Sequence, residues 1–228
     1  MRIWHVSDVM TSDVVTVGPA TPYREVVALL AAYRINAVPV VDADRRVLGV
    51  VSESDLLRKV EYAGADRPQW FEIRGRAARR KAGALTAGEL MSAPAEVALA
   101  TTGIRAAARR MDEAHVKQLP VEDLLGRLVG MVSRSDLLKE HLRHDDDIRV
   151  DVQEAVREAT LTERDATVET TVERGQVTLS GHVERWSTAV LVERLVRLVA
   201  GVVFVDSRVA FDIDDHDLVD PAPAYFVA

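Results

Sequence analysis

The stretch Gly49-Val50-Val51-Ser52-Glu53-Ser54-Asp55-Leu56-Leu57 decides how this chain is organised. Its apolar beginning predicts the end of a buried strand, and Ser52 followed three residues later by Asp55 predicts the start of a helix. The free backbone N–H groups at a helix start attract phosphate, and an aspartate there can accept hydrogen bonds from a ribose diol. In a single copy, the same Ser-x-x-Asp pattern is more typical of an ordinary capping box that binds no ligand.

A second copy of this pattern, Gly130-Met131-Val132-Ser133-Arg134-Ser135-Asp136-Leu137-Leu138, lies 81 residues further along the chain. The same offset pairs residues outside the motif, namely Met10 with Met91, Thr21 with Thr102, Pro39 with Pro120, Asp42 with Asp123 and Arg46 with Arg127. A unit of about 50 residues buries a core poorly on its own. We therefore expect two units to pack face to face with pseudo-twofold symmetry, which would bring equivalent loops into paired clefts.

The composition favours packed modules and excludes several classes of protein. With 228 residues, of which 48% are hydrophobic, the chain can form packed cores in one or two domains. It has no cysteine, which excludes disulfides, thiolate metal sites and a cysteine nucleophile, and which is typical of a reducing compartment. Because neither a signal peptide nor a membrane span is evident, we expect a cytoplasmic protein. The net charge of −7 argues against a general nucleic-acid-binding surface.

Each copy shows the order strand, helix, strand, strand, helix. In the first copy, we expect Thr21 to cap a helix that has Pro22 in its first turn and apolar residues at helical spacing as far as Tyr33. The elements expected in the first copy are residues 14–17, 22–33, 37–41, 47–51 and 53–60. Those expected in the second copy are residues 96–99, 103–114, 118–122, 128–132 and 135–142.

The pattern predicts a first repeat over residues 1–59, a linker over 60–88 and a second repeat over 89–143. The linker carries a basic run that consists of Arg74, Arg76, Arg79, Arg80 and Lys81. A solvated helix or a mobile loop would explain this run, and so would a segment that contacts phosphate or a partner. Trp70-Phe71, just before the run, is expected to pack on the repeats.

The pattern changes after three consecutive aspartates, and we expect a further domain over residues 147–213. Apolar residues at helical spacing after Ile148 predict a helix, and alternation on both sides of Arg174-Gly175 predicts a hairpin of residues 167–173 and 176–182. A helix over 186–199 and a strand over 202–211 complete a small α+β domain. Residues 214–228 are acidic and then proline-rich, which is typical of a disordered tail or a docking peptide.

The duplicated unit resembles the CBS domain. The resemblance rests on Val9-Met10 and Leu90-Met91, on the strands with Pro39 and Pro120, and on the Gly-x-x-Ser-x-x-Asp motifs at 49–55 and 130–136. It covers residues 7–142 in tandem and implies a mixed α+β or α/β fold, in which two βαββα repeats pack as a pseudo-twofold pair. It also implies an adenosine-containing ligand (AMP, ADP, ATP or S-adenosylmethionine) in clefts between the repeats.

The resemblance further implies which residues would bind the nucleotide. Asp55 and Asp136 would hold ribose hydroxyls, Ser52 and Ser133 would meet the ribose or the phosphates, and Thr16 would close the base pocket. The rest of the implied site consists of Ala37, Val38, Pro39, Ser54, Val97, Lys117, Gln118, Leu119, Pro120, Arg134 and Ser135, with Arg34 and His115 as further phosphate contacts.

The two clefts are not equivalent in sequence. Thr16 aligns with Val97, which cannot form a side-chain hydrogen bond. Each basic residue near the motifs is typical of a solvated surface when taken alone, but together they favour at least one cleft that accepts an anion. These residues are Arg34, His115, Lys117 and Arg134. We therefore predict one good nucleotide site and one weak or empty site.

The third domain resembles the BON domain through the hairpin at 172–183 and the segment Gly201–Val205. This resemblance implies binding of a phospholipid or another ligand, or an anchoring role, and the whole chain resembles bacterial CBS–BON proteins. Acidic residues around the hairpin argue against strong binding to anionic lipid.

No pattern in the sequence indicates catalysis. The six histidines form no ligand-spaced cluster, and His141 and His144, close to acidic residues, are typical of a helix surface. There is no nucleophile elbow and no Walker-type loop. We expect neither an enzyme nor a metal site, and no required cofactor apart from the adenosine-containing ligand.

Two functions stay open. In the first, a regulatory protein senses an adenine nucleotide between its repeats, and the third domain is an output or docking module. In the second, the repeats are a dimeric scaffold with empty clefts, and the third domain binds phospholipid or a partner protein. The CBS resemblance implies a homodimer through the helices at 22–33 and 53–60 and their counterparts in the second repeat.

Overall fold

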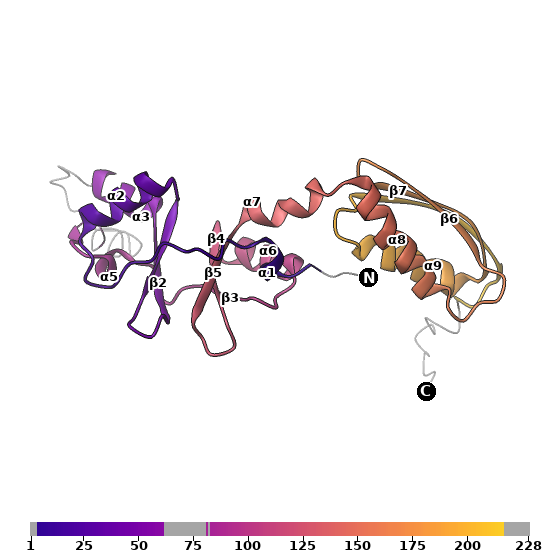
Figure 1. The fold of residues 1–228 in the computed structure, drawn as a ribbon, viewed down its shortest axis with the longest axis horizontal. Helices are drawn as coiled ribbons and strands as arrows, with labels where there is room; N and C mark the ends of the chain where they lie inside the picture. The colour runs from indigo at the N-terminus through magenta and orange to yellow at the C-terminus, as the bar shows by residue number, and fades with distance from the viewer. Residues whose placement is uncertain (1–3, 62–80, 82, 217–228) are drawn as a thin grey trace, which may run out of the picture. The chain divides into compact units, whose positions relative to one another are not determined.

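A computed structural model describes all residues except 1–3, 62–80, 82 and 217–228 (Figure 1). The chain divides into two compact units, one of residues His5–Leu137 and the other of Leu138–Ala228 with Met1–Trp4. Trp70-Phe71 and all of the basic run except Lys81 lie outside the described residues. Among the helices of the described ranges, none has the length and the apolar character needed to cross a bilayer.

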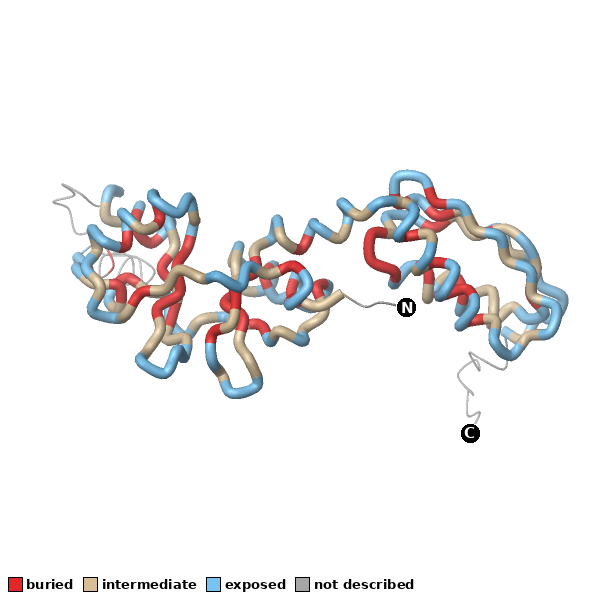
Figure 2. Tube along the Cα trace, in the orientation of Figure 1, coloured by how far each residue is buried: buried red, intermediate tan, exposed pale blue. Residues whose placement is uncertain are grey.

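The first repeat consists of α1 (Val6–Val9), α2 (Tyr23–Tyr33), β1 (Ala37–Val41), β2 (Val47–Ser52) and α3 (Glu53–Glu61). Strands β1 and β2 form an antiparallel hairpin. Val26 and Leu30 lie about one turn apart on α2, so both face the core, where they pack with Val38 and Val40 of β1. The burial along this part of the chain can be followed in Figure 2.

The second repeat consists of α5 (Ala87–Leu90), β3 (Ala98–Leu99), α6 (Ile104–Glu113), β4 (Gln118–Glu122), β5 (Leu128–Ser133) and α7 (Arg134–Leu137). β3 pairs parallel with β4, and β4 pairs antiparallel with β5. Gln118 is opposite Ser133, as Ala37 is opposite Ser52 in the first repeat. The two hairpins therefore share one register.

The bridges between the repeats have pseudo-twofold symmetry. The 81-residue offset relates the bridge between Thr11 and Met131 to the bridge between Ser92 and Val50. It likewise relates the bridge between His5 and Gly103 to the bridge between Thr86 and Pro22. Arg46 and Arg127, which the same offset relates, bridge each other and so mark the axis. The predicted pseudo-twofold pair is confirmed.

Two glycines of the repeated motif allow the repeats to approach each other. Met91 lies against Gly49, and Met10 lies against Gly130. A Cβ atom on either glycine would come closer than 3.0 Å to the methionine sulfur. A larger residue at either position would therefore displace the methionine of the opposite repeat.

Three predicted elements of the repeats are wrong in detail. Residues 14–17 form no strand, because Gly18-Pro19 follows at once and only Val17 bridges β1, at Val40. Thr21 does not cap α2: its hydroxyl accepts a hydrogen bond from the Gly18 amide, and Pro22 occupies the N-cap position. The helix predicted over 135–142 is the short α7 followed by a 3₁₀ helix at Leu138–Leu142, whose terminal leucines are exposed and supply no buried face.

The second unit consists of α8 (Asp145–Ala159), β6 (Thr167–Glu173), β7 (Gln176–Arg185), α9 (Trp186–Leu198) and β8 (Phe204–Ile213). The sheet order is β6-β7-β8. β7 and β8 are parallel, and α9 supplies the crossover that parallel strands need. β8 begins two residues later than predicted, because the Val202 amide donates to the Val199 carbonyl in a turn and the Val203 amide donates to the Gly175 carbonyl of the β6–β7 turn.

Asp145 connects the start of α8 to the β6–β7 turn. Its carboxylate oxygens accept hydrogen bonds from the amides of Arg174, at 2.6 Å, and Gly175, at 2.9 Å. Both turn residues have positive φ, 53° and 72°, as a two-residue type I′ turn requires. These two backbone hydrogen bonds are the main cause of the lowered pKa of Asp145, and the positive charges of Arg149 and Arg174 lower it further.

We predict that Asp145→Asn destabilises the protein near neutral pH and matters little in acid. A carboxylate with a lowered folded pKa contributes stability above its unfolded pKa, and this contribution is lost as the pH falls through the folded value. Urea unfolding of both proteins at about pH 7 and at a series of falling pH values below the unfolded pKa measures the difference. Asp146→Asn, at the neighbouring exposed residue, is the control and should change little. A loss that stays the same at every pH would contradict this role for Asp145.

We also predict that Gly130→Ala destabilises the paired repeats by about 1–3 kcal/mol, because the added methyl group overlaps Met10 and lies tightly, at 3.1 Å, against the Thr11 carbonyl. Gly18→Ala is the matched control, because nothing lies within 4 Å of a Cβ at that position. Urea denaturation of the two variants gives the comparison. Equal stability of the two variants would show that the Met10–Gly130 contact is not tight.

Candidate functional site

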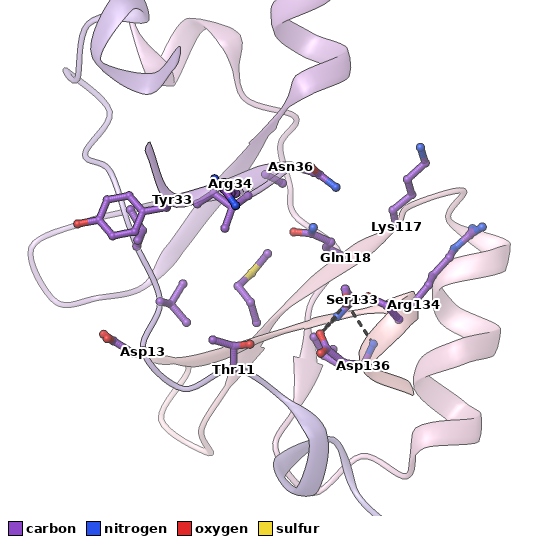
Figure 3. A pocket seen from close by; sticks show the side chains of 17 residues that line it. Thr11, Asp13, Tyr33, Arg34, Asn36, Lys117, Gln118, Ser133, Arg134 and Asp136 are labelled. Carbon is purple, nitrogen blue, oxygen red and sulfur yellow. Dashed lines mark hydrogen bonds between the residues drawn. The ribbon is translucent and has the colours of Figure 1, made fainter. Parts of the chain in front are cut away.

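A pocket of about 660 Å³ lies between the two repeats (Figure 3). The first repeat contributes two groups of residues. Those from the segment after α1 are Thr11, Asp13, Val14 and Val15, and those from the connection of α2 to β1 are Tyr33, Arg34, Ile35, Asn36 and Ala37. The second repeat contributes Lys117, Gln118, Met131, Val132, Ser133, Arg134, Ser135 and Asp136. Neither repeat could form this pocket alone.

The Ser-x-x-Asp motif of the second repeat forms a complete capping box at this pocket. The Asp136 carboxylate accepts hydrogen bonds from the Ser133 amide, at 2.8 Å, and from the Ser133 hydroxyl, at 2.6 Å. The Asp136 amide donates to Ser133 Oγ at 3.2 Å. Both side chains nevertheless remain partly exposed and line the pocket. Capping and contact with the pocket are therefore compatible in this repeat.

The same motif has a different environment in the first repeat. Asp55 is only 5% exposed, and one of its oxygens accepts from the Ser52 amide at 2.9 Å and the Ser52 hydroxyl at 2.8 Å. The other oxygen accepts from Lys81 Nζ at 2.6 Å. Lys81 also donates to Ser92 Oγ at 2.8 Å. Groups of the chain itself therefore engage both oxygens of Asp55.

Three basic side chains line the pocket, namely Arg34 at the end of α2 and Lys117 and Arg134 in the second repeat. Arg34 is the C-cap of α2 and has a left-handed backbone, with φ of 53°. Lys117 is exposed, whereas the Arg134 guanidinium donates to the carbonyls of Val116 and Met111 at 3.2 and 3.4 Å. Because α7 has only four residues, its dipole is small, and an anion in this pocket would depend on these side chains.

The other residues predicted for the site do not line this pocket. Four of them are buried in the strands, namely Val38, Pro39, Leu119 and Pro120. Ser52, Ser54 and Asp55 belong to the motif of the first repeat. Thr16 and His115 lie close in sequence to pocket-lining segments, whereas Val97 directly precedes β3 and is not near any of them in sequence. Over the described residues, no group of three or more histidine, aspartate and glutamate side chains is placed to hold a metal ion.

The structure adds pocket residues that the sequence analysis did not select. They are Thr11, Asp13, Val14, Val15, Tyr33, Ile35, Asn36, Met131 and Val132. A signal for the first of them was present, because Thr11 follows Met10, which the 81-residue offset pairs with Met91. What the offset did not show is that the segment after Met10 crosses to the opposite repeat and bridges Met131.

This chain belongs to the CBS domain family and carries a BON domain after its second repeat. The CBS domain matches residues 6–62 and 87–143, and the BON domain matches residues 134–212. The predicted family and its architecture are confirmed.

Curated relatives share the CBS part of the chain. The chloroplastic CBS domain-containing protein CBSX1 of Arabidopsis thaliana is 30% identical over 155 residues, which are 62% of this chain and 65% of CBSX1. Inosine-5′-monophosphate dehydrogenase of Mycobacterium tuberculosis is 31% identical over 130 residues, which are 57% of this chain and 21% of that enzyme. The match therefore spans less than two thirds of either relative.

A solved relative supports the same fold. The crystal structure of CBSX2 in complex with AMP superposes with a TM-score of 0.54 at 28% sequence identity, covering 61% of this chain and 97% of CBSX2. CBSX2 is a chloroplastic protein of Arabidopsis thaliana. A CBS-pair relative of this chain thus binds AMP.

Proposed function

We propose that this protein is a non-catalytic regulatory protein that senses an adenine nucleotide in the pocket between its CBS repeats. The observation that carries the proposal is the composition of the pocket, where the Ser133–Asp136 motif of one repeat faces Arg34 of the other. A carboxylate accepts hydrogen bonds from ribose hydroxyls, and basic side chains neutralise phosphate charge. The AMP complex of the related CBSX2 supports an adenosine-containing ligand.

In this proposal, each part of the nucleotide has a matching part of the pocket. Asp136 and Ser133 would hold the ribose, and Arg34 and Lys117 would neutralise the phosphates. The apolar side chains Val14, Val15, Ile35 and Met131 would contact the base. A small anionic ligand with a polar ring thus fits both the charge and the apolar surface of the lining.

The backbone of Arg34 gives further support. A left-handed conformation costs a residue other than glycine roughly 1–2 kcal/mol, and glycine is the usual residue just after a helix. Arg34 adopts this conformation at the edge of the pocket. We infer that the charge of its side chain is useful there, since a glycine would relieve the strain.

Regulation would follow from the shared construction of the pocket. Because both repeats contribute side chains, the contacts with a ligand depend on how the repeats are placed relative to each other. A nucleotide shifts that arrangement only by its difference in affinity for the two states. The third domain would read out the shift or provide the docking surface.

We predict that Asp136→Asn lowers the affinity for AMP by about tenfold or more, because hydrogen bonds to a charged acceptor contribute about 1.5–3 kcal/mol. Asp55→Asn is the matched variant and should leave the affinity of the Asp136 pocket nearly unchanged. Isothermal titration calorimetry with AMP and ATP gives the affinities, and thermal melting checks that both variants fold. Equal losses in the two variants would contradict the assignment of the site to Asp136.

The alternative function is a scaffold with empty clefts, whose BON domain binds phospholipid or a partner protein. The observation in its favour is that Phe204, Phe211 and Ile213 on β8 are 40–59% exposed. Asp212 and Asp214, which alternate with Phe211 and Ile213 at the end of β8, favour a protein partner over anionic lipid. If the wild-type protein gave no heat with AMP, ATP or S-adenosylmethionine, the scaffold would be the better account.

We further propose that the protein is a homodimer through α2 and α3. Val27 and Leu57, which are 38% and 64% exposed, line an apolar groove between these helices, and Val60 at the end of α3 is 68% exposed. Burial of such a patch against a second copy removes apolar surface from water. The counterpart helix α6 instead exposes Arg105 and Arg109, so the first repeat would supply the apolar part of the interface.

We predict that Leu57→Glu shifts the protein from dimer to monomer, because a charge would have to be buried in the interface. Leu124→Glu is the control, since Leu124 is 85% exposed on the β4–β5 turn, outside the proposed interface. Size-exclusion chromatography with light scattering measures both masses. A monomeric wild type, or a dimeric Leu57→Glu variant, would refute this interface.

A further inference from the structure

Lys81 is a buried cation that the proposed nucleotide pocket does not use. The Lys81 side chain is 9% exposed, and its ammonium lies 2.6 Å from Asp55 Oδ1. The Asp55 side chain is itself only 7% exposed. It lies 2.8 Å from Ser92 Oγ. Lys81 therefore does not behave as the solvated charge that a basic run usually provides.

The pseudo-twofold symmetry shows which residues of the pair correspond to the two partners of Lys81. The 81-residue offset relates Asp55 to Asp136 and Ser92 to Thr11. Asp136 and Thr11 both line the open pocket, and Thr11 bridges Met131 as Ser92 bridges Val50. The Lys81 ammonium thus bonds to Asp55 and Ser92, which are the symmetry counterparts of the pocket-lining residues Asp136 and Thr11. Neither Asp55 nor Ser92 lines the pocket itself.

We propose that Lys81 is an internal ligand that closes the Asp55 half-site to adenosine-containing ligands and limits the chain to one nucleotide. This inference rests on the proposed function of the Asp136 pocket. The Lys81 ammonium occupies the carboxylate oxygen of Asp55 that Ser52 leaves available, and it also engages the hydroxyl of Ser92. A ribose hydroxyl would have to replace it at the same acceptor.

Physical chemistry favours the lysine in this competition. An ammonium–carboxylate hydrogen bond is charge-assisted, whereas a ribose hydroxyl is a neutral donor. Lys81 belongs to the same chain as Asp55, so its effective concentration at this acceptor does not depend on the supply of a ligand. Displacement would also leave the buried Asp55 carboxylate without a compensating charge.

Isothermal titration calorimetry of the full chain with AMP tests this inference through the stoichiometry. We expect about one AMP per chain for the wild type and about two for Lys81→Met, because methionine keeps the apolar stem and removes the ammonium. Lys59→Met is the matched control, since Lys59 donates to the Ala84 carbonyl and lies over Tyr23, and we expect about one AMP per chain.

The outcomes separate this inference from the proposed function. One AMP bound by both the wild type and Lys81→Met would overturn the role of Lys81 and leave the proposed function intact. Two AMP bound by the wild type would also overturn it. Binding to neither protein would overturn the proposed function together with this inference.

A measurement on the native protein covers the case in which Lys81→Met does not fold. Acylation with an amine reagent, followed by mass spectrometry, should label Lys81 more slowly than the exposed Lys139. Saturating AMP should leave the labelling rate of Lys81 unchanged, because AMP occupies only the Asp136 pocket. Faster labelling of Lys81 in the presence of AMP would show that the nucleotide displaces it, which would overturn the inference.

Discussion

The contact of each motif glycine with a methionine of the opposite repeat is the constraint on which the CBS pair depends. Met10 lies against Gly130 and Met91 against Gly49, with no room for a Cβ at either glycine. This contact brings the segment after Met10 next to the Ser133–Asp136 motif, where Thr11 bridges Met131. The composite pocket is a consequence of the way in which each repeat completes the other.

The backbone of the pair is symmetric, whereas the two half-sites differ in their side chains. The 81-residue offset relates the registers of the two hairpins, the bridges between the repeats, and the left-handed residues Arg34 and His115. Among the described residues, the difference is the Lys81 ammonium, which comes from the segment between the repeats and pairs with Asp55 Oδ1. A duplicated fold can in this way carry two sites with different properties.

Much of the fold could be predicted from the sequence, because local pattern decides it. The strands at 37–41 and 118–122 and the Arg174-Gly175 turn follow from apolar runs and turn chemistry, and the structure has them as predicted. The pocket was only partly predictable: Ala37 and Asp136 line it, as the CBS resemblance implied, but Val38 and Asp55 are buried and do not line it. Lys81 was beyond sequence reasoning, since its contact with Asp55 depends on tertiary packing and a basic run resembles a solvated surface.

A crystal structure of the full chain grown with AMP tests the central claim most directly. The account predicts one AMP in the Asp136 pocket, with its ribose hydroxyls donating to the Asp136 carboxylate, and Lys81 still bonded to Asp55. An AMP on Asp55 with Lys81 displaced, or an AMP that makes no contact with Asp136, would contradict it.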